Sequence, residues 1–400
     1  MKIVFLTSHY PPDLGAGAFR SVALVQALSR KLTLEDEIHV VTTYPHRYAS
    51  HEVTAMGNEG SFENVYIHRI QLTNHQNGMA DQVRAFTGFF CKALRYCYKI
   101  KPTFIVGTTS RLGSGILTWF ASILVGCRYF IDVRDIFSET LEDVISLKRR
   151  WLGRPLGMIF SSIEKFIFLR ASGINVVSKG FPDYYLKQGL DVSEWSFFPN
   201  GVDREFINYN SMPIKKELGP KTVLYAGNIG DGQGLEIILP YVAEQVDGDF
   251  KFRIIGDGGT RNLLENKIIE LGIDNIELLA PVGREQLCRY YDQADILFLH
   301  LNDLPAFDRV LPSKIFEYGA LGKPIVAGIS GYSAKFIKDN LPQASVFYPG
   351  NIDDCLLSLQ RAEQCDVRSS DVERFVDEFS REVIMENMAN HIVSKVPDNA

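Results

Sequence analysis

The chain has 400 residues, 46% hydrophobic and 22% charged, with a formal net charge of −6. This length exceeds one ordinary core, so two domains are expected, and the composition is that of a soluble globular protein. The acidic balance argues against general nucleic-acid binding. The six cysteines form no Cys-x-x-Cys pair and have no zinc-like spacing with histidine, which indicates reduced thiols.

No secretory signal is expected, because the apolar start at residues 1–6 is too short for the apolar core of a signal peptide. The best candidate for a membrane span lies between Arg111 and Arg128. It is shorter than the roughly 20 apolar residues that a span requires. We therefore predict a buried helix in that segment.

The first half of the chain alternates strands and helices, as in a doubly wound domain. The expected strands are 2–7, 37–43, 65–70, 104–108, 128–133 and 173–178, and the expected helices are 21–30, 81–99 and 112–125. Gly15 and Gly17 in the first loop allow close approach of the backbone to a ligand, or form only a tight turn. A dinucleotide fingerprint would need a small residue in place of Arg20 and an acidic end to strand 37–43, so a dehydrogenase is disfavoured.

Two charged residues, Arg134 and Asp135, follow strand 128–133 at the edge where ligands meet parallel sheets. They are candidates for the reaction centre. The alternative is a structural pairing of Arg134 with Asp132 or Asp135.

Residues 144–172 combine basic and apolar side chains without a clean polar face. This pattern fits docking on an anionic membrane surface or a partly buried helix that covers the sheet. The membrane interpretation rests on Lys148, Arg149, Arg150 and Arg154.

The break at Pro199-Asn-Gly201 is the best domain boundary, and the alternation restarts after it. Strands are expected at 221–228, 250–255, 275–279, 296–299, 325–327 and 345–348, and helices from 235, near 261, at 286–292, at 314–321 and at 371–396.

Three small-residue turns follow predicted strands: 227–234, 256–259 and the approach to Ser313. By itself the last is an ordinary helix start, with Ser313 as N-cap, Lys314 beside it and Glu317 one turn in. In a doubly wound sheet, however, such turns converge on one edge. Their backbone amides and a helix start can then hold a diphosphate, and Glu317 can hold a sugar diol.

The motifs Pro199-Asn-Gly-Val-Asp203, Gly227-Asn-Ile-Gly-Asp-Gly-Gln-Gly-Leu-Glu236, Gly256-Asp-Gly-Gly259 and Pro312-Ser-Lys-Ile-Phe-Glu-Tyr-Gly319 resemble those of retaining glycosyltransferases of family 4. The resemblance covers nearly the whole chain and is weakest at 45–100. It implies an α/β fold of the GT-B type, with two Rossmann-like, doubly wound domains facing a central cleft. The residues of these motifs are similar to those of the bacterial branch that transfers N-acetyl-fucosamine-type sugars in surface-polysaccharide synthesis.

The resemblance also implies roles for individual residues. Glu317 would bind the ribose hydroxyls, and Ser313, Lys314 and the following amides, including that of Ile315, would hold the diphosphate. Gly256 and Gly258 would line the nucleotide pocket, with Val282 against the base. Gly15 and Gly17 would approach the phosphate and sugar, and Asp135 or Arg134 would lie near the sugar. Asp135, Lys314 and Glu317 are therefore the expected catalytic residues.

The chain departs from the family pattern at two places. Arg309, with Asp308 beside it, stands where the family often has an earlier glutamate, so both are candidates for sugar or acceptor contacts. Many members carry Arg and Lys where this chain has Asn228 and Gln233. Phosphate charge would then be met by amides, Lys314 and Arg20 or Arg261, and glucose and mannose become less favoured donors.

No metal or other cofactor is expected, because amides and Lys314 can stabilise the negative charge on the departing phosphate. Asp247-Gly-Asp249 could be read as a metal-binding Asp-x-Asp, but these residues are equally typical of a turn.

We therefore expect an acceptor-binding domain at 1–200, a nucleotide-sugar-binding domain at 201–380, and a last helix at 381–400 that packs on the first. The expected reaction moves an amino sugar from a UDP-sugar to a polyprenyl-diphosphate-linked saccharide, in O-antigen or capsule synthesis, by a cytoplasmic protein held peripherally at the inner membrane face. The alternatives are a sugar-nucleotide epimerase or hydrolase, and a non-catalytic nucleotide-sugar-binding assembly protein.

Overall fold

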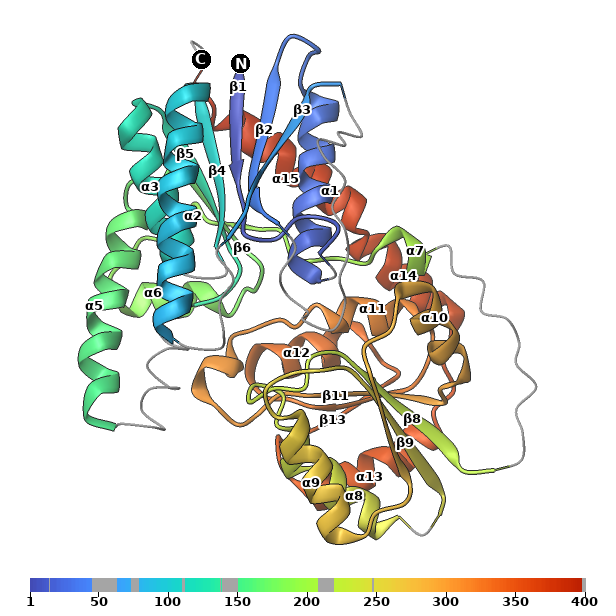
Figure 1. Ribbon diagram of the computed structural model, residues 1–400. Coiled ribbons are helices and arrows are strands. Elements are labelled where there is room, and N and C mark those ends of the chain that lie inside the picture. Colours follow the sequence, from blue (N-terminus) through green and yellow to red (C-terminus); the bar gives the residue numbers. More distant parts are fainter. Residues whose placement is uncertain are drawn as a thin grey trace. The chain divides into compact units, whose positions relative to one another are not determined.

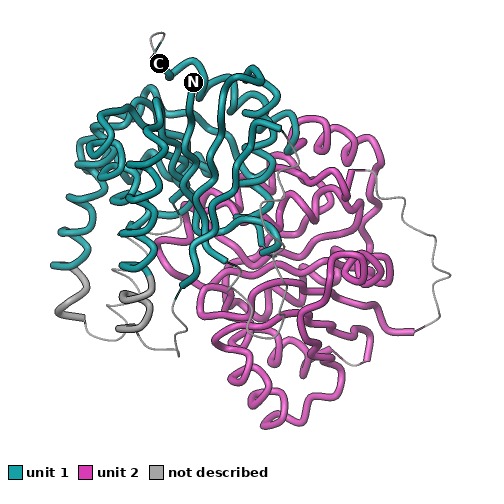
Figure 2. Tube along the Cα trace, turned by 45° about the horizontal axis from the view of Figure 1, so that its top comes forward, with its two compact units in different colours: residues 1–200, 381–400 teal, residues 201–380 magenta. Residues whose placement is uncertain are grey.

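The computed structural model describes residues 1–13, 15–44, 63–72, 79–109, 112–136, 138, 150–207, 219–246 and 248–397. For residues 79–85 and 150–154 it describes the backbone only. The chain divides into two compact units, which Figure 2 colours separately. Unit 1 contains Met1–Asn200 and Arg381–Ala400, and unit 2 contains Gly201–Ser380.

Unit 1 is built on a seven-stranded sheet with the order β3-β2-β1-β4-β5-β6-β7. Its strands are β1 (Lys2–Leu6), β2 (Glu37–Thr43), β3 (Val65–Ile70), β4 (Phe104–Thr109), β5 (Arg128–Val133), β6 (Gly173–Val176) and β7 (Ser196–Phe197). All of their described pairings are parallel. Continuous apolar runs form the central strands because both faces of a parallel sheet are covered by helices.

The helices of unit 1 cover the two faces of its sheet (Figure 1). Helices α1 and α15 pack together, and α3 contacts both α2 and α5. Their bounds are α1 (Ala16–Lys31), α2 (Met79–Ile100), α3 (Leu112–Val125), α5 (Arg150–Phe168), α6 (Phe181–Lys187) and α15 (Arg381–Ser394). The expected strands and helices of this half are present.

Unit 2 has a six-stranded sheet with the order β10-β9-β8-β11-β12-β13, also with parallel described pairings. Its strands are β8 (Lys221–Ala226), β9 (Phe250–Ile255), β10 (Ile276–Leu279), β11 (Ile296–His300), β12 (Ile325–Gly328) and β13 (Ala344–Phe347). Its helical segments are α7 (Arg204–Ile207), η1 (Leu235–Ile237), α8 (Leu239–Gln245), α9 (Arg261–Leu271), α10 (Arg284–Gln293), η2 (Pro305–Asp308), α11 (Lys314–Ala320), α12 (Gly331–Asn340), α13 (Ile352–Glu363) and α14 (Ser369–Phe379).

The last predicted helix, 371–396, is two helices in the structure. Ser380 interrupts it with an extended backbone between α14 and α15. Phe375 and Phe379 on α14 pack against Phe316 in unit 2, whereas α15 belongs to unit 1 and contacts α1. The two halves are packed in different units, and these tertiary contacts override the continuous apolar pattern.

The first helix also differs from its prediction. It begins at Ala16, five residues before the predicted start, since 21 − 16 = 5. Gly15 is its N-cap and Gly17 lies in its first turn. A Cβ atom on Gly17 would lie 2.4 Å from Nη1 of Arg134, so the glycine makes room for that guanidinium. Two predicted site residues of unit 1 are thus brought together.

Arg20 is buried in unit 1, at 1% exposure, and its guanidinium is used within that unit. Its Nε and Nη2 each donate to the Asp132 carboxylate at 2.8 Å. Its Nη1 donates to the Pro199 carbonyl at 2.7 Å, and its Nη2 also donates to the Phe198 carbonyl at 2.9 Å. The structure therefore replaces the predicted phosphate or sugar contact of Arg20 with a structural one. It also pairs Asp132 with Arg20 and not with Arg134.

None of the described helices is long and apolar enough to cross a membrane. The segment between Arg111 and Arg128, the best candidate from sequence, is the helix α3 that covers the sheet of unit 1.

Replacing Arg20 by Met should lower the free energy of unfolding by about 3–5 kcal/mol, because Asp132 would stay buried without its cation. Urea denaturation followed by circular dichroism measures this change. Arg30→Met is the matched control on the same helix, since the Arg30–Glu386 pair is 38% and 41% exposed and should contribute less than about 1 kcal/mol. Equal losses in the two variants would contradict the role given to the buried pair.

Candidate functional site

The sheet of unit 2 changes its direction of winding between β8 and β11. In doubly wound sheets ligands bind at such a switch point, beyond the carboxyl ends of the strands. The loop after β8 (227–234) and the segment from β11 to α11 (301–313) leave the sheet there. The loop after β9 (256–260) is their neighbour.

Gly256 and Gly258 are required by the contact between two of these loops. A Cβ atom on Gly256 would lie 1.9 Å from the Gly227 carbonyl oxygen, and one on Gly258 would lie 2.3 Å from the Ile229 carbonyl oxygen. The Ile229 amide also donates to the Asp257 carbonyl at 2.9 Å. The backbone of the second loop therefore supports the first.

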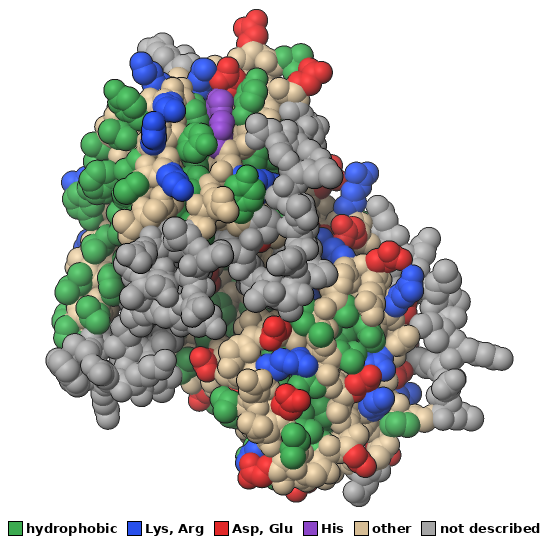
Figure 3. All heavy atoms as spheres, viewed as in Figure 1, with side chains coloured by type: hydrophobic (Ala, Val, Ile, Leu, Met, Phe, Trp, Pro, Cys, Tyr) green, Lys and Arg blue, Asp and Glu red, His purple; other side chains and the backbone are tan. Residues whose placement is uncertain are grey.

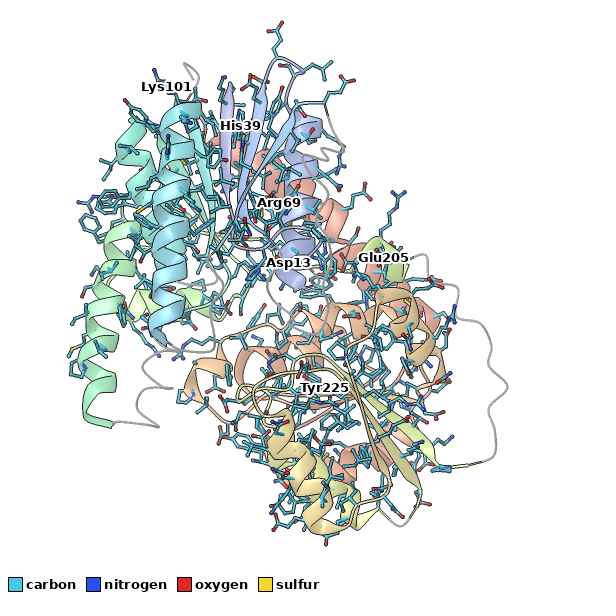
Figure 4. All side chains as sticks on the ribbon, in the orientation of Figure 1. Asp13, His39, Arg69, Lys101, Glu205 and Tyr225 are labelled. Carbon is cyan, nitrogen blue, oxygen red and sulfur yellow. The ribbon has the colours of Figure 1, made fainter. Side chains whose placement is uncertain are left out.

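Asn228 and Gln233, both predicted to bind the donor, contact each other. Asn228 Nδ2 donates to Gln233 Oε1 at 2.7 Å, and the hydroxyl of Tyr225, labelled on β8 in Figure 4, donates to the Asn228 carbonyl at 2.5 Å. These contacts close the glycine-rich loop on itself.

His300, the last residue of β11, anchors this loop through hydrogen bonds of its ring. Its Nδ1 donates to the Gln233 carbonyl at 2.6 Å, and its Nε2 accepts from the Gly350 amide at 3.1 Å. The ring is buried, and desolvation lowers the pKa of His300 to about 4. It is therefore neutral near pH 7 and joins the loops that follow β8 and β13.

Lys314 and Glu317 lie in the first turn of α11 and form an ion pair at 2.7 Å. The Tyr291 hydroxyl, from α10, is 2.6 Å from Glu317 Oε1 and 3.0 Å from Lys314 Nζ. The side chains of Lys314 and Glu317 are 24% and 17% exposed, while Tyr291 is fully buried. A cation and a carboxylate thus reach the surface together.

The predicted N-cap role of Ser313 is wrong. Ser313 has helical backbone angles and its side chain makes no capping hydrogen bond. The amides of Ile315 and Phe316 bond instead to the carbonyls of Pro312 and Ser313, at 3.1 and 3.2 Å. The buried side chain of Ile315 packs in the core. The predicted diphosphate contact of the Ile315 amide is therefore replaced by a bond within the turn.

The remaining predicted residues of unit 2 have local partners. Asp308 accepts from Ser330 Oγ at 2.6 Å, and Arg309 Nη1 donates to the Pro305 carbonyl at 2.9 Å. Val282 is half-buried in the loop before α10. Arg261 donates to the carbonyls of Gly256 and Leu279, so it stabilises the loop after β9.

In unit 1, Arg134 and Asp135 follow the carboxyl end of β5 as expected. Asp135 lines a small cavity with Thr109 and Glu164. Asp13 and Arg69, labelled in Figure 4, lie at the same edge of this sheet, and sequence reasoning did not single them out.

Several predictions fall where the structure gives no side-chain description. Lys148, Arg149 and Asp247 lie outside the described residues, and for Arg150 and Arg154 only their place in α5 is described. Among the described residues, no cluster of His, Cys, Asp and Glu could hold a metal ion.

Residues 210–377 match the family model for glycosyl transferases group 1. The matched residues lie within unit 2.

Curated relatives extend this likeness beyond unit 2. WcaI of Escherichia coli strain K12, assigned as a colanic acid biosynthesis glycosyl transferase, is 22% identical over 58% of this chain and 59% of its own. The uncharacterized glycosyltransferase MJ1178 of Methanocaldococcus jannaschii is 23% identical over 85% of each chain. WbjE of Pseudomonas aeruginosa, assigned as a glycosyltransferase, is 26% identical over 51% of each chain. The chain thus spans little more than half the length of two of these relatives.

Solved structures share the fold of the whole chain. The sucrose-phosphate synthase of Thermosynechococcus elongatus matches with a TM-score of 0.72 at 16% identity, covering 98% of both chains. The lipopolysaccharide outer core galactosyltransferase WaaB matches with a TM-score of 0.63 at 14% identity, covering 99% of this chain and 100% of its own. Anabaena HepE, solved with UDP-glucose, matches with a TM-score of 0.67 at 15% identity, covering 98% and 100%. The predicted GT-B fold class is confirmed.

The low pKa of His300 predicts that unit 2 loses stability in acid. An ordinary histidine pKa of 6.5 falls to about 4 in the folded state, so the unfolded chain binds the proton more readily between these values. The stabilisation is present above pH 6.5, is lost as the pH falls, and is gone below pH 4. Between pH 7 and pH 5 the free energy of unfolding should drop by about 2 kcal/mol from this group.

Urea denaturation of the wild type and of His300→Gln across pH 7 to 5 isolates this contribution. The variant should be less stable at pH 7 and should lack that part of the pH dependence. Identical pH slopes in the two proteins would contradict a neutral, buried His300.

Proposed function

We propose that the chain is a retaining glycosyltransferase of family 4. It moves an N-acetylated amino sugar, including deoxy amino sugars, from a UDP-linked donor to a polyprenyl-diphosphate-linked saccharide. The product is a precursor of a bacterial surface polysaccharide, either O-antigen or capsule. The ion pair of Lys314 and Glu317 at the switch point of unit 2 is the observation that carries the proposal.

Glu317 supplies the ribose contact. Its Oε1 accepts from Tyr291 and its Oε2 accepts from Lys314, and each carboxylate oxygen has a further lone pair for a ligand hydroxyl. The side chain is buried enough for such a contact to displace water, yet 17% of it remains exposed. The HepE structure with UDP-glucose supports a UDP-sugar as the donor class.

Lys314 supplies the leaving-group contact. Breaking a sugar–diphosphate bond leaves negative charge on the departing phosphate, and a positioned ammonium stabilises that charge as it develops. Two of the three N–H groups of Lys314 are used by Glu317 and Tyr291 within the described residues, which leaves one for the phosphate. The reaction would then need no metal ion, and Asp135 and Arg134 would contact the sugar or acceptor.

The loops of unit 2 and the relatives of the chain support the proposed class of sugar and of product. The bonded pair of Asn228 and Gln233 replaces the cations that many family members use, so the donor contacts there are made by amides. The relative WcaI is assigned to colanic acid biosynthesis, which supports surface-polysaccharide synthesis.

A screen of UDP-N-acetyl sugars for release of UDP, with and without a polyprenyl-diphosphate saccharide, tests the proposal. Acceptor-dependent release is expected for at least one donor. Hydrolysis without transfer would favour a sugar-nucleotide hydrolase or epimerase. UDP binding with no turnover would favour a non-catalytic assembly protein.

Glu317→Ala should weaken UDP binding about tenfold or more, because a hydrogen bond to a charged group is lost. Lys314→Ala should lower kcat by about 10²-fold and affect UDP affinity less, because its main contact forms as the phosphate departs. Calorimetry and steady-state kinetics measure the two effects. Glu285→Ala and Lys335→Ala, exposed positions on α10 and α12, serve as matched controls. Wild-type behaviour in both site variants would refute the assignment.

Unit 1 presents a surface suited to peripheral contact with a membrane. Exposed hydrophobic side chains gather on α3 and α5: Phe120, Ile123, Leu124, Met158, Ile159 and Phe166, with Leu169 directly after α5. Figure 3 shows hydrophobic and basic side chains side by side on the flank of unit 1 that carries these helices. Arg170 lies over the Phe166 ring at 3.6 Å. Apolar contact flanked by cations is the chemistry that binds anionic lipid headgroups.

Replacing Lys148, Arg149 and Arg150 by Gln should reduce binding to phosphatidylglycerol vesicles about 100-fold, at about 1 kcal/mol per cation near the surface. Vesicle co-sedimentation measures the change, and binding to phosphatidylcholine vesicles should stay weak throughout. Lys335→Gln with Lys338→Gln, exposed on α12, is the control for loss of charge alone. Unchanged binding of the triple variant would reject the membrane contact.

A further inference from the structure

Tyr291 contacts both charged residues of the site, Lys314 and Glu317, from a buried position. It is fully buried on α10, and its hydroxyl lies 2.6 Å from Glu317 Oε1 and 3.0 Å from Lys314 Nζ. Lys314 Nζ and Glu317 Oε2 are themselves 2.7 Å apart. The three side chains form a closed ring of hydrogen bonds between α10 and α11.

The direction of each bond in this ring is fixed by chemistry. A carboxylate only accepts, so the Tyr291 hydroxyl donates its single proton to Glu317. An ammonium only donates, so Lys314 donates to the oxygen of Tyr291 and to Glu317. Burial raises the pKa of Tyr291 well above its ordinary value, which keeps the hydroxyl protonated in this role.

The surroundings of Tyr291 hold its ring in place. Its ring centroid is 6.1 Å from those of Phe206 and Tyr318, in edge-to-face packing with both. The hydroxyl of Tyr318 accepts from the Ala226 amide at 3.3 Å, which ties this packing to the end of β8. Lys314 and Glu317 are partly exposed and can reach a ligand, but Tyr291 cannot.

We propose that Tyr291 is a positioning residue, whose hydroxyl fixes the Lys314 ammonium and the Glu317 carboxylate at the spacing that a diphosphate and a ribose diol require. This inference rests on the function proposed above. The remaining N–H of Lys314 then faces the phosphate from a side chain whose conformation is already fixed. A lysine is otherwise a flexible point charge on a long stem, so the anchoring increases its effect.

Tyr291→Phe removes the hydroxyl and keeps the buried ring. Lys314 loses one of its two anchors and Glu317 loses a donor, so UDP should bind about tenfold more weakly. Tyr290→Phe is the matched control, because Tyr290 is the neighbouring residue on α10. Its ring packs against Arg253, whose Cζ atom lies 5.1 Å from the ring centroid. This variant should bind UDP within twofold of the wild type.

A double-mutant cycle distinguishes positioning from a general structural effect. Calorimetry with UDP is performed on the wild type, Tyr291→Phe, Glu317→Ala and the double variant, after thermal unfolding confirms that each is folded. If Tyr291 acts on UDP binding through Glu317, its removal should change the affinity by less than about twofold in the Glu317→Ala background. If the two substitutions weaken UDP binding independently, so that their fold-changes in affinity multiply in the double variant, the positioning role of Tyr291 is overturned. The same holds if Tyr291→Phe binds UDP as tightly as Tyr290→Phe does.

The same calorimetry distinguishes failure of the proposed function from failure of the positioning role. If the wild type itself binds no UDP in calorimetry, both that function and the role of Tyr291 are refuted. If the wild type binds UDP and the cycle is additive, only the positioning role is refuted.

Discussion

Every described strand pairing in the two sheets is parallel, and this constraint decides where polar side chains can gather. Parallel strands need a crossover on a face of the sheet, so both faces are covered and the loops after the strands are left for ligands. In unit 2 the same constraint brings the loops after β8, β9 and β11 to one edge. A site for a nucleotide is then a consequence of the topology together with the residues those loops carry.

The two units use buried charge differently. In unit 1 the bidentate pair of Arg20 and Asp132 is sealed in the core, where it joins α1 to β5 and to the chain that leaves for unit 2. In unit 2 the pair of Lys314 and Glu317 remains partly exposed and is supported by one fully buried hydroxyl. The first arrangement only stabilises the fold, because each nitrogen of the Arg20 guanidinium is bonded within unit 1. The second keeps hydrogen-bonding capacity for a ligand.

The strands of both sheets were predictable because buried parallel strands are short, continuous apolar runs. Lys314 and Glu317 were predictable because they share one helical turn. Tyr291 was missed, since its contact with them joins two helices and leaves no local spacing. Arg20 was misassigned because a glycine-rich loop beside a cation looks the same whether the cation faces a ligand or the core. The break at Ser380 depends on which unit buries each half of the last helical segment.

Hydrogen–deuterium exchange with and without UDP tests the central claim most directly, because it locates the nucleotide without a donor or an acceptor. Addition of UDP is expected to slow exchange in residues 227–234, 256–260 and 311–320 of unit 2. Residues 352–363, on α13 and away from those loops, should exchange at an unchanged rate. Protection confined to other segments, or none at saturating UDP, would contradict a nucleotide site built on Lys314 and Glu317.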